Sequence, residues 1–258
     1  MRWVDLGGMN ALEQQFSPIG DCGIRISFGS EPSPERSRKM MNFKEQIESS
    51  ALGGITDIIP GYATLAIFYD PFEWTYPALC AELKTILSEL DEAAVKAPIV
   101  YHIPVCYEEP FNLDLDDVAQ MNQLAANEVV SLHANRLYYI YMLGFLPGFP
   151  YLGGMDKRIA APRLASPRLN VSAGSVGIAG EQTGVYPLQS PGGWRIIGKT
   201  PIRLYDPDRK PAILLSAGNY VRFYPISYDD YTNIEKEVIR GVFCVKTTEY
   251  IGDSHVSN

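Results

Sequence analysis

The sequence predicts two folded parts, a small two-layer α+β domain followed by a mainly-β domain built as a barrel or a sandwich. Three observations favour this. The length of 258 residues is enough for two domains of ordinary size. The first third of the chain alternates between strand-like and helix-like apolar patterns. The second half is interrupted by glycine and proline every few residues up to Pro225, which is typical of short strands joined by tight turns.

The predicted order of elements in the first domain is β-α-β-β-α. Ile24, Ile26 and Phe28 alternate with polar residues, as in a half-buried strand. Ser33 followed by Pro34 is typical of a helix start. The stretches "ITDIIPG" and "YATLAIFYD" predict two further strands, and a second helix begins at Thr75. We place this domain at residues 1–97; residues 1–14 lack periodicity, which fits either disorder or a start-site artefact.

The second predicted domain covers residues 98–258 and begins with the strand "IVYHIPVCY". Two short helices are expected at 114–123 and 125–135, followed by the strand "RLYYIYML". Short strands and turns then continue to Pro225. The stretch "SYDDYTNIEKEVIRGVF" predicts a surface helix that begins near Ser227, and the tail after it has no assignable pattern.

The bulk composition describes a folded, acidic protein. Apolar residues make up 46% of the chain, charged residues make up 20%, and the formal net charge is -8. The negative charge argues against nucleic acid or an anionic membrane as the default partner. The four cysteines are far apart, which predicts packed, reduced thiols, and the three histidines form no metal-ligand motif. Without a leader pattern or a membrane-length apolar run, we expect a cytoplasmic protein.

Positive charge is concentrated between Gly144 and Arg203. This segment holds seven basic and two acidic residues, a net charge of +5, so that the rest of the chain carries −13. A basic segment within an acidic protein is a candidate anion site. The alternative is a set of solvated arginines on loops, and the charge count alone leaves both interpretations open.

Residues 193–200 match the G-x-x-x-x-G-K-[ST] pattern of a phosphate-binding loop. The residue types within the match do not suit the turn and the helix start that a phosphate-binding loop requires. The four middle residues, from Trp194 to Ile197, are bulky and strand-like, and Pro201 disfavours the helix that must start at the Lys-Thr pair. We therefore interpret this stretch as two short strands joined at Gly198, with "PIRLYD" as a further strand.

Two stretches are dense in residues that core packing does not require. The first is "MLGFLPGFPYLGG", a rigid loop of glycine, proline and aromatic residues. The second, from Pro162 to Trp194, carries Arg163 and Arg168, each after a proline, and neutral donors and acceptors. Guanidinium groups suit a carboxylate or a phosphate, although each arginine also fits a surface salt bridge. His133 is a helix-end cap or a proton carrier.

At these residues the chain resembles a known family. The stretches "GFLPGFPYLGG", "AGSVGIAGEQTGVYPLQSPGGWRIIGKTP" and "GNYVRFYPIS" look like those of the 5-oxoprolinase B subunit, also called the kinase inhibitor KipI or allophanate hydrolase subunit 1 family. "IGDCGIRISFG" and "IPGYATLAIFYD" resemble the N-terminal domain of the same family. The likeness covers about residues 16 to 228, and its longest block is ordered enough to be a specific signal.

The resemblance implies a cyclophilin-like β-barrel as the second domain. It also implies one component of an ATP-dependent lactam hydrolase, which works in a complex with a homologous C subunit of the allophanate hydrolase subunit 2 type and with an A subunit. Such a complex opens 5-oxo-L-proline to L-glutamate, using ATP with Mg²⁺. Carried onto this sequence, the catalytic candidates are Arg163 and Arg168, and the substrate-binding candidates are Gly148, Gly174, Gln182, Thr183, Ser190 and Trp194. His133 is a further catalytic candidate from its place at the helix end alone.

Other functions stay open at this point. Kinase-inhibitor members of the family are regulatory proteins that bind a sensor histidine kinase, which requires an exposed apolar surface. Urea carboxylases carry a similar pair of domains, so a carboxyltransferase-like role in a urea or allophanate pathway is a weaker alternative. The chain departs from the family at Ser172, where proline is usual, and at Glu108, Glu109 and Glu181, which puts the substrate preference in doubt.

Overall fold

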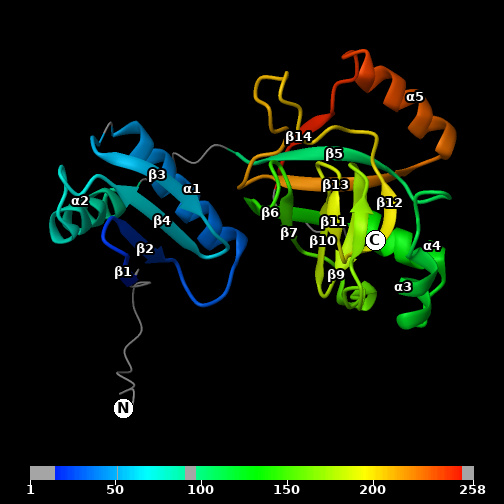
Figure 1. Ribbon diagram of the computed structural model, residues 1–258, viewed down its shortest axis with the longest axis horizontal. Helices are drawn as coiled ribbons and strands as arrows, with labels where there is room; N and C mark the ends of the chain where they lie inside the picture. Colours follow the sequence, from blue (N-terminus) through cyan, green and yellow to red (C-terminus); the bar gives the residue numbers. More distant parts are fainter. Residues whose placement is uncertain (1–14, 51, 91–96, 252–258) are drawn as a thin grey trace, which may run out of the picture. The chain divides into compact units, whose positions relative to one another are not determined.

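The computed structural model describes residues 15–50, 52–90 and 97–251, and the chain divides into two compact units, Met1–Val95 and Lys96–Asn258 (Figure 1). Each unit has a hydrophobic core of its own. The predicted fold class, an α+β unit followed by a mainly-β barrel, is confirmed. The predicted division at residue 97 stays a prediction, and the expectation for residues 1–14 lies outside the described residues.

The first unit is one antiparallel sheet of four strands in the order β1-β2-β4-β3. Both helices bury their apolar residues in the core that also contains the inward side chains of β2 and β4, which gives the two expected layers. The structure adds one strand to the predicted order. This first strand was not predicted because only Phe16 of it packs on the core, and it carries a proline, as edge strands often do. The elements are β1 (Gln15–Ile19), β2 (Gly23–Ser27), α1 (Pro34–Ser49), β3 (Ile55–Pro60), β4 (Thr64–Tyr69) and α2 (Tyr76–Ser88).

Both helices of the first unit start where the sequence predicts. The side chain of Ser33 accepts a hydrogen bond from the backbone N–H of Arg36, and that of Thr75 accepts one from Ala78. Each cap satisfies a backbone donor that the first helical turn leaves without a partner.

The second unit is a barrel of mixed strands. The strand order is β12-β9-β10-β7-β6-β13-β5, and the pairing of Lys199 with Cys106 joins β12 to β5 and closes the ring, while β14 adds to the outer edge of β5. One pair, β13 with β5, is parallel. The strands are β5 (Ile99–Cys106), β6 (Leu137–Leu143), β7 (Pro150–Gly153), β9 (Ser175–Ala179), β10 (Gln182–Val185), β12 (Arg195–Lys199), β13 (Tyr220–Ile226) and β14 (Thr247–Glu249).

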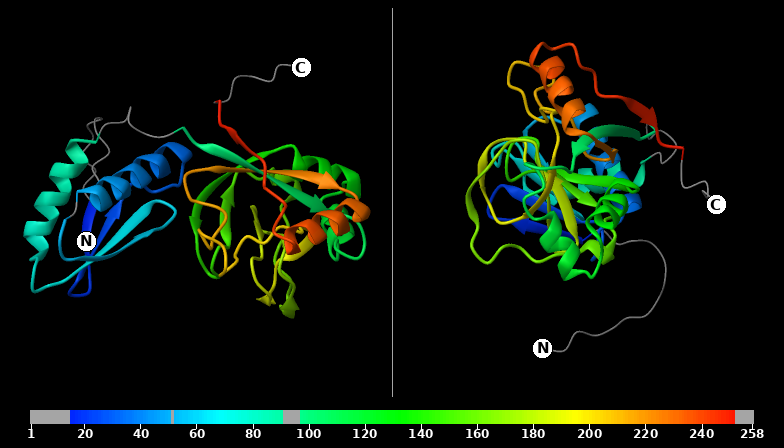
Figure 2. Two further views of the ribbon diagram at one scale, coloured as in Figure 1. Left: turned by 90° about the horizontal axis from the view of Figure 1, so that it is seen from above. Right: turned by 90° about the vertical axis from the view of Figure 1, so that its right-hand side faces the viewer.

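Three helices and a two-stranded sheet complete the described part of the barrel unit. Helices α3 (Leu115–Met121) and α4 (Ala126–Ala134) lie at one end of the barrel, and their apolar residues join its core (Figure 1). Helix α5 (Tyr228–Ile239) lies on the outside against β5 and begins at the predicted cap, Ser227 (Figure 2). The two-stranded sheet pairs β8 (Arg168–Val171) with β11 (Ser190–Gly192), and a short 3-10 turn, η2, covers Lys157–Ile159.

Two predictions about local structure were wrong in detail. The residues of the phosphate-loop match form one strand, β12, with an irregularity between Ile196 and Gly198, instead of two strands joined at a glycine. These residues form no phosphate loop. The stretch "PIRLYD" is not a strand: its pairing is an isolated bridge between Tyr205 and Ile213, beside which the guanidinium of Arg209 donates to the carbonyls of Arg203, Leu204 and Ala212.

The thiols and the helices bear on two further expectations. Cys80 and Cys106 are buried and free, as predicted for packed thiols, but Cys22 and Cys244 are exposed, which corrects the prediction for those two. Among the helices in the described residues, none combines the length and the apolar character that a membrane span requires.

Candidate functional site

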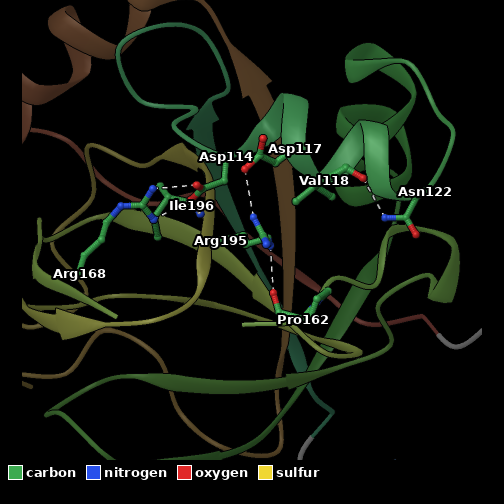
Figure 3. Close-up of polar contacts among 8 residues, drawn as sticks. All are labelled: Asp114, Asp117, Val118, Asn122, Pro162, Arg168, Arg195 and Ile196. Carbon is green, nitrogen blue, oxygen red and sulfur yellow. Dashed lines mark hydrogen bonds and ion pairs between the residues drawn. The ribbon is translucent and has the colours of Figure 1, made fainter. Parts of the chain in front are cut away.

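Arg168 is held by a buried carboxylate. Its two terminal nitrogens donate to the two oxygens of Asp114 at 2.8 and 2.7 Å, a bidentate pair (Figure 3). Asp114 is 4% exposed and also accepts the backbone N–H of Ile196 at 2.6 Å. This hydrogen-bonded pairing raises the pKa of Arg168. The side chain of Arg168 is 30% exposed, so the fixed guanidinium still faces solvent along part of its surface.

Arg195 makes a second fixed cation beside the first. Its Nε donates to the carbonyl of Pro162 at 3.0 Å, and a terminal nitrogen donates to Asp117 at 3.1 Å (Figure 3). Arg195 is 8% exposed, whereas the side chain of Asp117 is 59% exposed. Helix α3 thus supplies Asp117, and the residue that precedes the helix supplies Asp114, so the two aspartates tie this part of the chain to β8 and β12.

Tyr186 lies where several predicted site residues meet. Burial raises its pKa, while a hydrogen bond from the backbone N–H of Trp194 and the positive charges of Arg163 and Arg168 lower it in part. The positive charges of both arginines therefore act on the Tyr186 hydroxyl. In the described residues Arg163 is exposed and makes no ion pair.

A buried aromatic cluster packs against the ring of Tyr186. The rings of Phe149, Tyr186 and Trp194 meet edge to face, and all three side chains are buried. The chain reaches Phe149 through the predicted rigid loop, in which Phe145 has a left-handed backbone (φ 67°) and is 68% exposed. Trp194, a predicted binding residue, is 6% exposed and so belongs chiefly to this cluster.

His133 and Thr183 form a continuous hydrogen-bonded chain inside the barrel. The hydroxyl of Thr183 donates to the carbonyl of Gly177, so it accepts from Nε2–H of His133 at 2.8 Å, and Nδ1 of His133 accepts from the hydroxyl of Tyr107 at 2.8 Å. Burial lowers the pKa of His133 to about 3, so the ring is neutral. These contacts favour a structural role, and the catalytic assignment of His133 stays a prediction.

The remaining predicted residues lie on four different segments. Gln182 precedes Thr183 on β10, and Ser190 begins β11 opposite Val171, with its hydroxyl donating to the carbonyl of Pro191 at 3.2 Å. Gly148 lies against Leu204 and the side chains of Tyr205 and Ile213. Gly174 lies against the carbonyl of Thr200. Arg163, Arg168 and Trp194 thus act on the Tyr186 side chain, and Gly174 meets the same residue through the backbone, because its N–H donates to the carbonyl of Tyr186 at 2.7 Å. Gly148 makes neither kind of contact with Tyr186.

Most cations of the basic segment have a carboxylate partner. Lys157 pairs with Glu181, Arg158 with Asp156, and Arg203 with Asp206 at a longer 3.8 Å. Together with the pairs of Arg168 and Arg195, these leave Arg163 and Lys199 as the segment's cations without an ion pair in the described residues. Within the same residues, no group of three or more potential metal ligands is found.

Sequence reasoning missed Asp114 and Tyr186. Asp114 stands before a helix, where an aspartate normally caps the first turn, yet its side chain makes no cap hydrogen bond because Arg168 and Ile196 occupy its oxygens. Asp114 lies 54 positions before Arg168, so no local pattern in the sequence indicated this pairing.

Comparison with known proteins gives a consistent result. The carboxyltransferase domain, subdomain C and D, matches residues 14–215. The 5-oxoprolinase B subunit of Bacillus subtilis (strain 168) is 42% identical over 236 residues, which cover 88% of this chain and 98% of the relative. The 5-oxoprolinase B subunit of Haemophilus influenzae is 36% identical over 206 residues, 80% of this chain and 95% of the relative.

A solved structure supports the fold. The crystal structure of the K. lactis urea amidolyase superimposes on this chain with a TM-score of 0.75. The alignment covers 95% of this chain and 17% of the urea amidolyase chain. At 21% identity this likeness shows the fold alone.

Proposed function

The chain belongs to the family of 5-oxoprolinase B subunits, and from that premise we propose that it binds 5-oxo-L-proline within an assembled, ATP-dependent enzyme that opens the lactam to L-glutamate. The identity to the Bacillus subtilis protein, which extends over 98% of that relative, supports this assignment. Within the chain, the site we propose is the group around Tyr186, with Arg163 and Arg168 as the ligand-binding cations.

The observation that carries the proposal is the state of Arg168. A guanidinium has five N–H donors, and Asp114 takes two of them, so three remain for a ligand. The bidentate pair fixes the plane of the group before a ligand arrives, which lowers the entropic cost of binding. Arg163, exposed and without an ion pair in the described residues, adds a second positive charge near the same hydroxyl.

The chemistry of the substrate matches such a group. 5-Oxo-L-proline carries a carboxylate at neutral pH, which suits a guanidinium fork. Its lactam carbonyl is unreactive because the ring nitrogen donates electrons to it, and negative charge collects on the oxygen when the bond is attacked. Fixed N–H donors stabilise that charge without reorganising during the reaction. Arg163 and Arg168 bind and orient the anion in this scheme, and Gln182, Ser190 and the buried Thr183 belong to its surroundings.

The residues that match a phosphate-binding loop form the strand β12, so they do not hold ATP in the manner of such a loop. We therefore place ATP, with the Mg²⁺ that accompanies it, in the complex with the A and C subunits rather than on this chain alone, and we derive no step through it.

A regulatory role as a histidine-kinase inhibitor is the second candidate, because one observation favours a protein partner. Leu169 on strand β8 is 91% exposed, and Phe145 is 68% exposed. Exposed apolar side chains of this size suit docking of another protein. They serve the other components of the enzyme equally well, so the kinase role is decided by experiment. The carboxyltransferase-like role is supported by the description of the matching family model, whereas the likeness to urea amidolyase shows the fold alone.

The test is release of glutamate from 5-oxo-L-proline and ATP by the chain co-expressed with the A and C subunits. We expect Arg163→Ala and Arg168→Ala each to lower kcat/KM, mainly through KM, because each removes a cation that binds the carboxylate. Arg158→Ala is the matched control: it also removes a cation of the basic segment, and its partner Asp156 keeps its ion pair with Arg136.

Full activity in both variants would refute the site while leaving the enzyme assignment intact. An inactive wild-type complex, together with a chain that blocks kinase autophosphorylation when added alone, would replace the enzyme assignment with the regulatory one.

A further inference from the structure

A cleft of about 320 Å³ lies between helix α5 and the segment that leaves β12, in the described part of the barrel unit. Helix α5 lies on the outside of the barrel, as Figure 2 shows. One wall comes from Lys199 to Arg203, the other from the α5 residues Tyr231, Glu235 and Val238, and Gly174 completes the lining. The proposed 5-oxoproline site around Tyr186 uses a different set of residues.

Two cations that line this cleft are not fully neutralised by an acidic partner. Lys199 has no ion pair in the described residues, and its ammonium lies 5.2 Å above the ring of Phe111 and 5.9 Å from that of Tyr231. Such rings hold an ammonium in place without neutralising it. Arg203 is 54% exposed and pairs only with Asp206, at 3.8 Å, which is longer than a hydrogen-bonded ion pair.

The opposite wall carries a negative charge. Glu235 lines the cleft, and one of its oxygens accepts the hydroxyl of Tyr231 at 3.1 Å. No ion pair links Glu235 to Lys199, to Arg203 or to any other described cation. The cleft therefore holds positive and negative groups that do not neutralise each other.

The floor of the cleft is rigid. Gly174 has a left-handed backbone (φ 83°), and a Cβ atom at this position would clash with the carbonyl oxygen of Thr200. The backbone N–H of Thr200 donates to the carbonyl of Gly174 at 2.9 Å, and the hydroxyl of Thr200 accepts from the N–H of Ile202 at 3.2 Å. These bonds fix the chain between Lys199 and Arg203, which presents the two cations.

We propose that this cleft binds a small α-amino acid, with its carboxylate on Lys199 and Arg203 and its ammonium on Glu235. An amino acid is the class of small ligand that carries both charges a few bonds apart, and the unjoined charges of the cleft complement both. A simple anion would leave Glu235 facing it, which costs binding energy. Val238 and Ile202 give the side chain an apolar surface. The site is independent of the proposed lactam opening.

The test is calorimetric titration of the full chain with pairs of probes that differ only in the ammonium group. The pairs are L-glutamate with glutarate and L-leucine with 4-methylpentanoate, and inorganic phosphate reports general anion binding. We expect at least one amino acid to bind about tenfold or more tightly than its deaminated analogue, since a charge-assisted hydrogen bond contributes on that order.

Variants locate the binding. Lys199→Met and Arg203→Met are expected to weaken the amino acid by about tenfold or more, and Glu235→Gln to abolish the preference over the deaminated analogue. Lys236→Met and Glu237→Gln, neighbours on α5 that do not line the cleft, are the matched controls. Thermal unfolding of every variant separates lost binding from lost folding.

Three results would each overturn the proposal: no binding of either amino acid at millimolar concentration, equal binding of an amino acid and its analogue, or binding that survives both cation variants. Because these titrations use the chain without its partners, they fail or succeed separately from the turnover assay of the complex.

Discussion

Removing the charge of Asp114 gives the most direct structural test of how Arg168 is held. Asp114→Asn keeps the size of the side chain and an oxygen for the N–H of Ile196, but it removes the carboxylate from a bidentate ion pair. Loss of one partner from a buried pair costs about 3–5 kcal/mol. Arg168 is 30% exposed and regains some hydration, so we expect about 2–3 kcal/mol, or a fall in Tm of roughly 4–12 °C.

Asp117→Asn is the matched control, because Asp117 pairs with Arg195 through a side chain that is 59% exposed. Exposed ion pairs contribute about 1 kcal/mol or less. Thermal and urea unfolding of the full chain measure both variants. Equal losses in the two variants, or no loss for Asp114→Asn, would refute the reasoning that burial of the carboxylate decides its contribution.

Two further predictions concern stability. Gly174→Ala should lower the free energy of unfolding by roughly 2–4 kcal/mol, because the added Cβ meets the carbonyl of Thr200 and the backbone is left-handed. Gly180→Ala should lower it by about 1 kcal/mol, because the backbone is also left-handed (φ 60°) but nothing lies near the added Cβ. Equal losses for the two variants in urea titrations would contradict this. Because burial lowers the pKa of His133 from 6.5 to about 3, the unfolded chain binds more protons between these values, and stability should fall as pH drops through that window by about 1.4 kcal/mol per pH unit. Urea unfolding across pH should show this slope in the wild type and a flatter one in His133→Gln.

The helix starts could be predicted because their chemistry is local. Ser33, Thr75 and Ser227 each accept a backbone N–H within three residues, so the sequence contains both partners of each bond. The close spacing of glycine and proline likewise predicted short strands in the second half.

Pairing between distant segments could not be predicted in the same way. Closure of the barrel depends on the pairing of Lys199 with Cys106, and the first strand, β1, is formed by its antiparallel pairing with β2. Periodicity reports which face of a strand is buried, but it does not report which strand lies beside it.

The candidate site was predicted in part for the same reason. The arginines were found from their residue type, but the carboxylate of Asp114 that orients Arg168 lies 54 positions earlier in the chain. The net charge of the basic segment also overstated its free positive charge, because Asp114, Asp117 and Asp206 pair with it from outside. His133 stands at a helix end in the sequence, yet its ring lies between Tyr107 and Thr183 in the core.

The KM for 5-oxo-L-proline of the assembled enzyme carrying Arg168→Lys tests the central claim most directly. Lysine keeps the positive charge beside Asp114 but has no planar fork, so it cannot hold the aspartate with two donors and offer three more to a ligand. We predict a KM raised by about tenfold or more with the complex still assembled. An unchanged KM in a folded, assembled variant would contradict the claim that this guanidinium binds the substrate.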